Sequence, residues 1–164
     1  RGATYTYRGS SSQANWIFYR LADIYLMKAE ALAQLAASAD ELEAVVALCN
    51  QTYTRACTTN DEVKDVLNPN VYASASDVQT LVLTERQREL MFEGKRWFDL
   101  LRLARRNDDV TTSWQYIESR YDDDVTTIRN KMSSIAAWYL PIYHNEMKIN
   151  ANLRQNEYYE SQDD

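Results

Sequence analysis

The sequence holds few of the residues that interrupt helices and few of those that build metal or disulfide sites. It has three Gly and two Pro among 164 residues, which argues against a turn-rich β fold and favours long helices. A single histidine, His144, argues against histidine-based metal sites. Cys49 and Cys57 lie on one predicted helix with roughly 12 Å of rise between them, too far for a disulfide within that helix. We therefore expect free or buried thiols, no metal site and no cofactor.

The sequence also lacks a basic cluster and a long apolar run. The net charge is −6 and no group of Lys and Arg stands out, so nucleic acid is not expected as a partner. No apolar stretch approaches the ~20 residues of a membrane-spanning helix. Apolar residues make up 45% and charged residues 26% of the chain, which is typical of a globular protein, and the length favours a single domain with its own core.

The first part of the chain predicts a lead-in and a pair of helices. Residues 1–14 read as an extended lead-in, and residues 15–57 as a helical hairpin. Apolar positions at helical spacing trace one face of its first helix: Ile17, Leu21, Ile24, Lys28 through its stem, Ala31, Leu32 and Leu35. Asp40 and Glu43 predict the start of the second helix, which runs to about Cys57. Such a hairpin is the unit of tetratricopeptide-type repeats.

The rest of the chain predicts one long helix and an irregular tail. After a loop at residues 58–75, Ser76 and Gln79 form a capping box that opens a helix over residues 76–106, roughly 45 Å long. Residues 107–164 predict loops, short helices and a C-terminal tail that is extended around Pro141. Four tail amides are suited to holding irregular backbone: Asn150, Asn152, Gln155 and Asn156. The expected fold is all-α, with a tetratricopeptide-like hairpin, a long helix and an extended tail.

Charged residues are interleaved with the apolar stripe of the predicted long helix, where an exposed helix would keep them on the opposite face. Leu83, Leu90, Trp97 and Ala104 recur at seven-residue spacing. The charged residues among them are Glu85, Arg86, Glu89, Glu93, Arg96 and Asp99. Neighbours at such spacings pair along a helix, so we expect some of these charges to be buried and paired. Gly94 is expected to mark a close approach of another backbone.

Glu85, Glu89 and Glu93 also permit an alternative interpretation as metal ligands or as an acid–base pair. A carboxylate metal site in a helical bundle uses Glu-x-x-His units on facing helices, and His144 lies far from this segment. Glycosidase carboxylates face one another across a cleft, whereas these three follow one helix. The segment is therefore interpreted as scaffold, with a carboxylate enzyme as the less favoured hypothesis.

Three separated segments together resemble the SusD/RagB family of nutrient-binding outer-membrane lipoproteins, specifically their C-terminal part. The first is Y-R-L-A-D-I-Y-L-M-K-A-E-A-L at residues 19–32. The second is E-R-Q-R-E-L-M-F-E-G-K-R-W-F-D-L-L-R at residues 85–102. The third is L-P-I-Y-H-N-E-M-K-I-N-A-N-L-R-Q-N at residues 140–156. The tail departs from the family pattern at Tyr143, where a second proline is common, and at Glu157 and Tyr158, which replace Pro-Gly.

The resemblance implies a non-catalytic protein at the cell surface of the outer membrane. It would bind oligosaccharides or polysaccharides and deliver them to a SusC-like TonB-dependent transporter, held to the membrane only by a lipid anchor that this sequence does not contain. Peptide import is the alternative within the family, and a helical-repeat interaction module without a small ligand is the alternative outside it. The shared motifs would be scaffold: Glu85, Arg86, Glu89, Glu93, Gly94, Arg96, Trp97 and Asp99.

If the ligand is a glycan, aromatic rings outside the core supply flat apolar faces for sugar C–H groups. Trp114, Tyr116 and Tyr121 lie in the segment where the helical pattern weakens. We therefore predict these three as ligand-binding residues, against the alternative that each packs at a helix end.

Overall fold

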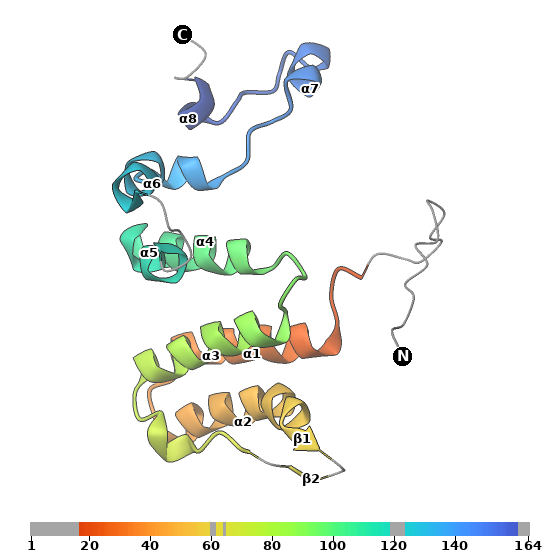
Figure 1. Cartoon of the computed structure of the whole chain (residues 1–164), viewed down its shortest axis with the longest axis vertical. Coiled ribbons are helices and arrows are strands. Elements are labelled where there is room, and N and C mark those ends of the chain that lie inside the picture. Colours follow the sequence, from red (N-terminus) through yellow and green to blue (C-terminus); the bar gives the residue numbers. More distant parts are fainter. Residues whose placement is uncertain (1–16, 60–61, 64, 119–123, 161–164) are drawn as a thin grey trace. The chain divides into compact units, whose positions relative to one another are not determined.

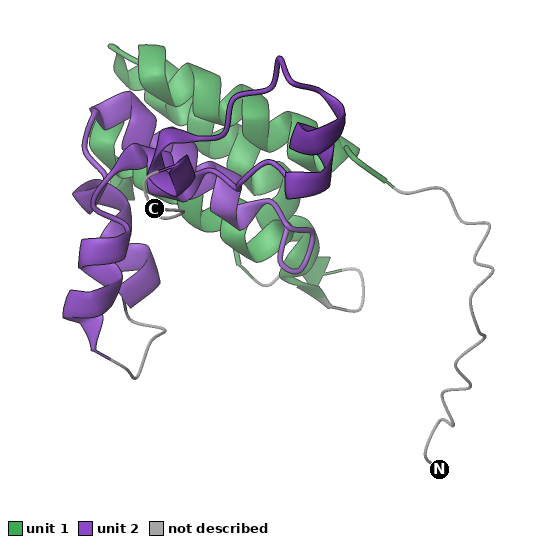
Figure 2. Ribbon diagram, turned by 90° about the horizontal axis from the view of Figure 1, so that it is seen from above, with its two compact units in different colours: residues 1–89 green, residues 90–164 purple. Residues whose placement is uncertain are grey.

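The computed structural model describes residues 17–59, 62–63, 65–118 and 124–160. The described chain forms two compact units, residues 1–89 and residues 90–164, which are coloured separately in Figure 2. Apart from two short strands, every regular element in the described ranges is helical (Figure 1). This confirms the all-α fold class.

Three helices pack together in the first unit, with two short strands and a single 3-10 turn between the second and the third. The elements are α1 (Leu21–Leu35), α2 (Ala39–Ala56), β1 (Thr58–Thr59), β2 (Glu62–Val63), η1 (Pro69–Val71) and α3 (Ala75–Glu89). The strands are antiparallel, with Thr58 opposite Val63. Each of the three helices contacts the other two, as the lower part of Figure 1 shows.

Capping boxes start α2 and α3 slightly earlier than the sequence predicts. Ser38, rather than Asp40, accepts the main-chain N–H of Glu41, and the Glu41 carboxylate accepts that of Ser38. Ser74 and Asp77 make the same exchange at the start of α3. Ser and Asp are both favoured at the N-cap of a helix, so two candidate cap residues in the same segment differ little in free energy. Gln79 instead donates from its amide to the main-chain carbonyl of Ala33 in α1, at 3.0 Å.

Helix α1 buries a different face from the one that its large apolar residues trace. Its buried residues are Asp23, Leu26, Ala29 and Ala33, and the small alanines allow the other helices to approach closely. The larger residues Leu21 and Leu35 are 65% and 76% exposed. Helix α1 is therefore apolar on two sides, and periodicity alone does not say which side faces the core.

The second unit consists of shorter helices. They are α4 (Arg96–Asn107), α5 (Thr111–Glu118), α6 (Val125–Lys131), η2 (Ile135–Trp138), α7 (His144–Ile149) and α8 (Glu157–Glu160). Helix α4 packs against α5 and η2, and η2 packs against α8. Trp138, at the end of η2, is the largest fully buried side chain among the described residues. Between η2 and α7 the chain runs without helix through Pro141, as predicted.

The long helix predicted over residues 76–106 is wrong, because α3 ends at Glu89 and α4 begins at Arg96. In the intervening segment Phe92 has φ 67° and Gly94 has φ 72°, values that a right-handed helix does not contain. A Cβ added to Gly94 would meet no atom within 4 Å. Gly94 therefore serves the backbone conformation of the break, not the close approach that the sequence suggested.

Candidate functional site

The charged residues of the motif in the first unit are buried at the contact between α1 and α3. Arg86 and Asp23 are both buried, and Nη1 of Arg86 lies 2.9 Å from Oδ1 of Asp23. The Nε of Arg86 lies 3.7 Å from a carboxylate oxygen of Glu30, also on α1. Burial of a charge is tolerated only with an opposite partner, and here α1 supplies that partner. These are buried and paired charges of the kind that the sequence predicts.

Glu89 joins the ends of three segments of the first unit. Its Oε1 accepts from Arg20, just before α1, and from Nη2 of Arg55, at the end of α2, the latter at 2.5 Å. The guanidinium of Arg20 also donates to the main-chain carbonyl of Glu89. That carbonyl is one of those left without an intrahelical partner where a helix ends. Arg20 therefore pairs with the charge of Glu89 and also bonds a main-chain carbonyl at the end of α3.

Glu85 is buried between these pairs, with Nη1 of Arg88 2.5 Å from its Oε1. Burial raises the pKa of the Glu85 carboxyl above its ordinary value, and the guanidinium of Arg88 opposes that rise. Burial also raises the pKa of the Cys49 thiol to about 12, with a smaller contribution from the negative charge of Glu85. Both cysteines are free, and Cys49 is fully buried.

The carboxylates considered as an alternative catalytic set do not form an acid–base pair. Glu85 and Glu89 are each held by arginine, and Glu93 is exposed in the break between α3 and α4. Within the described ranges, no group of three His, Cys, Asp or Glu residues could hold a metal ion.

The motif continues into the second unit, where it packs the tail. The indole N–H of Trp97 donates to the main-chain carbonyl of Trp138 at 3.0 Å, and the two rings stack with centroids 5.0 Å apart. Asp99 is buried, and its Oδ1 accepts from Nη2 of Arg102 at 2.8 Å. Ser113 of α5 is buried and donates to the carbonyl of Leu100. The segment thus ties α4 both to α5 and to η2.

Three amides of the tail motif hold irregular main chain, as predicted. The Gln155 side chain accepts the N–H of Ile142 and donates to its carbonyl, both at 2.9 Å. The amide of Asn156 donates to the carbonyl of Ala136 in η2 at 2.7 Å. The side chain of Asn150 accepts the main-chain N–H of Asn152. These bonds replace the ladder that a strand would provide.

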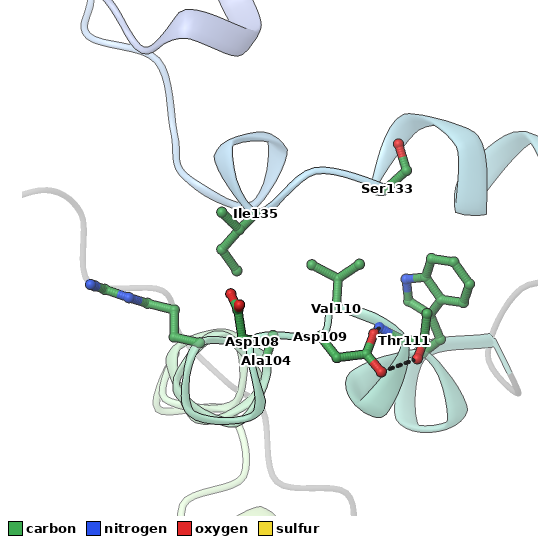
Figure 3. Close-up of a pocket in the computed structure, with 9 residues that line it drawn as sticks. Ala104, Asp108, Asp109, Val110, Thr111, Ser133 and Ile135 are labelled. Carbon is green, nitrogen blue, oxygen red and sulfur yellow. Dashed lines mark hydrogen bonds between the residues drawn. The ribbon is translucent and has the colours of Figure 1, made fainter.

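A partly open hollow of about 570 Å³ lies in the second unit, at the junction of α4 with α5 and beside η2. Pockets for small ligands have volumes of roughly 300–1,000 Å³. Its lining residues are Ala104, Arg105, Asp108, Asp109, Val110, Thr111, Trp114, Ser133 and Ile135. Figure 3 shows the carboxylate of Asp108 directed toward Ile135. The hollow therefore combines an apolar wall with charged groups.

The turn between α4 and α5 fixes the floor of this hollow. Asp108 is in the left-handed conformation at φ 50°, and its N–H caps α4. The Asp109 carboxylate accepts the N–H and the hydroxyl of Thr111, both at 2.8 Å (Figure 3). Asp109 is thus occupied in capping α5, whereas the side chain of Asp108 makes no hydrogen bond or ion pair with any described residue.

The structure places Trp114 and Tyr116, the two predicted aromatic residues that it describes, differently. Trp114 is partly buried on α5, lines the hollow, and has the guanidinium of Arg129 5.5 Å from its ring centroid. Tyr116 does not line the hollow, and Arg96 lies 5.2 Å from its ring centroid. Tyr121 lies outside the described residues. Each described ring thus has an arginine over one face.

Arg105, Asp108 and Ser133 were not recognised from the sequence as candidate site residues. They come from the end of α4, the following turn and the segment before η2, and no spacing rule connects them. By its composition the run Asn107-Asp108-Asp109 predicts only the end of a helix. An unpaired carboxylate in a hollow that an aromatic ring also lines is a signal that exists only in three dimensions.

Among the described residues, none of the helices combines the length and the apolar character needed to cross a membrane.

Comparison with known proteins gives consistent matches. The model of the SusD family matches residues 2–159. The SusD-like protein P38 of Formosa agariphila is 34% identical over 93 residues, which is 57% of this chain and 18% of that protein. The SusD-like protein P2 of the same organism is 32% identical over 100 residues, 61% of this chain and 19% of that protein. No solved structure matches the chain significantly.

These matches agree with the three motifs quoted from the sequence. The chain covers less than a fifth of the length of either curated relative, so the comparison identifies ancestry and scaffold, not the activity of a whole protein. The family match extends over nearly the entire chain. This chain therefore belongs to the SusD family.

Proposed function

We propose that this chain is part of a non-catalytic glycan-capturing protein of the bacterial cell surface. The observation that carries the proposal is the SusD family match over residues 2–159. In this role the protein binds oligosaccharides or polysaccharides at the outer membrane and delivers them to a SusC-like TonB-dependent transporter. It is anchored by lipid rather than by a span of its own. Affinity and delivery, not bond cleavage, are then the function.

The second unit supports the proposal by offering chemistry suited to sugars. Glycan recognition needs apolar ring surface for C–H groups and fixed polar groups for hydroxyls. Trp114 supplies the first at the wall of the hollow, beside the charged Arg105 and Asp108. We propose Trp114, with Tyr116 and Tyr121 from the same stretch of chain, as the ligand-contacting aromatic residues of this segment.

The test is calorimetry of the full-length protein against a panel of oligosaccharides and peptides. Saturable binding to an oligosaccharide, weakened in the Trp114→Ala/Tyr116→Ala/Tyr121→Ala variant whose helical circular dichroism is unchanged, supports both the function and the place of the contacts. Binding of the wild type to peptides alone would replace glycan with peptide import. Failure to bind any member of the panel would contradict small-ligand capture altogether.

A second candidate is a helical-repeat module that binds protein and no small ligand. The outward face of α1 favours it, because Leu21, Ile24 and Leu35 are exposed there at helical spacing. A repeat hairpin cannot bury its outer face alone and normally stacks against a neighbouring helix pair. This candidate predicts a saturable protein partner whose affinity falls on Leu21→Ser/Leu35→Ser, with no oligosaccharide binding; ordered sugar bound by the protein would contradict it.

A further inference from the structure

We propose that the hollow at the junction of α4 and α5 is a sugar subsite for a neutral pyranose. Arg105 and Asp108 bind the hydroxyls of the sugar, and its ring packs against Trp114. This inference rests on the proposed function and gives it a place and a ligand class.

Two opposite charges on the rim of the hollow remain available to a ligand. Arg105 and Asp108 both line the hollow and are three residues apart. Within the described ranges neither side chain forms an ion pair or a hydrogen bond, although the guanidinium of Arg105 lies 6.0 Å from the ring centroid of Tyr139. Other charged side chains of this unit pair with one another, as Glu118 does with Arg129 and Asp99 with Arg102. The hollow thus presents a donor and an acceptor that the fold does not use.

These two groups match a sugar ring in the hydrogen bonds that they can form. A guanidinium only donates hydrogen bonds and a carboxylate only accepts them, whereas each sugar hydroxyl does both. Neighbouring hydroxyls on one pyranose can therefore satisfy Arg105 and Asp108 together. Charge-assisted bonds of this kind are about twice as strong as neutral ones, which suits recognition of a single sugar unit.

The apolar side of the hollow offers a surface for the sugar ring. Val110, Trp114 and Ile135 contribute apolar surface to the lining, facing the space that the charged groups border. A pyranose has a C–H face and a hydroxyl edge, so one ring can pack on the wall while its hydroxyls reach the rim. The indole N–H of Trp114 is buried without an acceptor among the described residues, so the ring, not its N–H, is the recognition element.

Rigidity of the rim supports the assignment. Asp108 is held in the left-handed conformation between two helix ends, with its N–H bonded into the end of α4. Asp109 is locked onto Thr111 by two hydrogen bonds. A receptor group that is already ordered loses little conformational entropy when the ligand binds. The turn thus fixes the backbone from which the Asp108 carboxylate extends.

The charge of the lining selects the class of sugar. It contains one guanidinium and two carboxylates, Arg105 against Asp108 and Asp109. A uronate or sulfate on the bound unit would add a further negative charge beside carboxylates, which disfavours it. We therefore assign the subsite to neutral pyranoses.

The experiment is calorimetry on the full-length protein with neutral, uronate-containing and sulfated oligosaccharides and with oligopeptides. Asp108→Asn keeps a residue that tolerates the left-handed conformation and removes the charge, and Arg105→Gln removes the donor. Each is expected to weaken binding of a neutral oligosaccharide about tenfold or more. Arg106→Gln changes the same charge one residue away, outside the lining, and is expected to change affinity less than twofold. Unchanged helical circular dichroism shows that each variant is folded.

The outcomes separate this inference from the function on which it rests. If the wild type binds a glycan and Arg105→Gln and Asp108→Asn bind it equally well, the hollow is not the subsite, while glycan capture stands. If the wild type prefers sulfated or uronate sugars, or if Asp108→Asn strengthens their binding through these residues, the assignment to neutral sugars is overturned. If the same variants lose peptide binding instead, the hollow belongs to a peptide. If no glycan binds at all, the proposed function and the subsite both fail.

Discussion

The two units bury the polar groups of one continuous motif in different ways. In the first unit the buried groups carry full charges and pair with each other across helices, as Arg86 does with Asp23. In the second unit the motif's buried charge, Asp99, pairs with Arg102 of the same helix, and the indole N–H of Trp97 donates to the main-chain carbonyl of Trp138. Charged side chains therefore join helices in the first unit, whereas in the second a neutral N–H joins α4 to η2.

Separate probes can follow the two units. Trp97, Trp114 and Trp138 all lie in the second unit, so tryptophan fluorescence reports mainly on it. The buried Cys49 lies in the first, and the pKa of its thiol is about 12. Because the thiolate is the reactive form, labelling of Cys49 at pH 8 requires opening of the first unit.

Removing one member of the buried ion pair is expected to have the largest effect. Arg86→Met leaves Asp23 charged and buried without its partner, which costs about 3–5 kcal/mol of unfolding free energy. Urea titration followed by Cys49 labelling measures the loss. Replacing both residues, in Asp23→Leu/Arg86→Met, should recover most of it.

The control for this prediction is Lys28→Met, which removes a positive charge from the exposed side of α1. Its effect should stay within about 0.5 kcal/mol. An Arg86→Met variant as stable as the wild type would mean that the buried charges contribute nothing to the first unit.

Removing the side-chain amide of Gln155 in the second unit is expected to cost less unfolding free energy. Gln155→Ala leaves the N–H and the carbonyl of Ile142 without partners, a loss of about 1–2 kcal/mol for neutral, partly buried groups. Urea titration followed by tryptophan fluorescence measures it. Asn152→Ala removes an exposed amide a few residues away and should change stability by less than about 0.5 kcal/mol. Equal effects of the two substitutions would show that the two hydrogen bonds between Gln155 and Ile142 do not stabilise the unit.

Substitutions of Gly94, in the break between α3 and α4, are expected to have small effects on stability that depend on the new residue. Gly94→Ala introduces a Cβ that meets no atom, so its cost of about 1 kcal/mol comes only from the positive φ. Gly94→Asn should cost less, because Asn tolerates that conformation. Thermal unfolding measures both. A stabilised Gly94→Ala variant with increased helical circular dichroism would show that α3 and α4 can join into one helix.

Two carboxyl groups should give pH dependences of opposite sign. The pKa of Glu85 is raised by burial, so the folded state binds a proton more tightly, and the wild type loses stability relative to Glu85→Gln as pH rises above about 4.5. The hydrogen bond from Arg129 lowers the pKa of Glu118. The stability that Glu118 contributes is therefore present above about 4.5 and lost as pH falls through its folded pKa. Urea titrations from pH 3 to 8 of the wild type, Glu85→Gln and Glu118→Gln test both signs, and parallel curves for all three would contradict them.

Sequence reasoning succeeded where a residue's chemistry restricted its surroundings. An Arg such as Arg86 within an apolar stripe has to be paired when buried, and Gln155 in a non-helical tail has to find main-chain groups. It failed where two arrangements satisfy the same pattern. The heptad of Leu83, Leu90 and Trp97 continues across residues 90–95, so periodicity predicted one helix, and only the positive φ of Phe92 and Gly94 reveals the break.

The candidate site was the least predictable part. The aromatic ring of Trp114 and its place in a weak helical pattern predict a ligand-binding residue, and Trp114 does line the hollow. Arg105, Asp108 and Ile135 meet there because of how α4 ends and where η2 packs, and these depend on tertiary contacts that local spacing does not encode. Periodicity does not predict the buried face of α1 for the same reason.

Phe92 gives the break a practical consequence. Its side chain is 97% exposed in a segment that lies outside any helix, which is the presentation that a protease specific for aromatic residues requires. A brief chymotrypsin digest is expected to nick the chain after Phe92, with each fragment carrying the core of one unit. Whether the nicked halves stay together on a sizing column then becomes a direct measure of how strongly the two units hold one another.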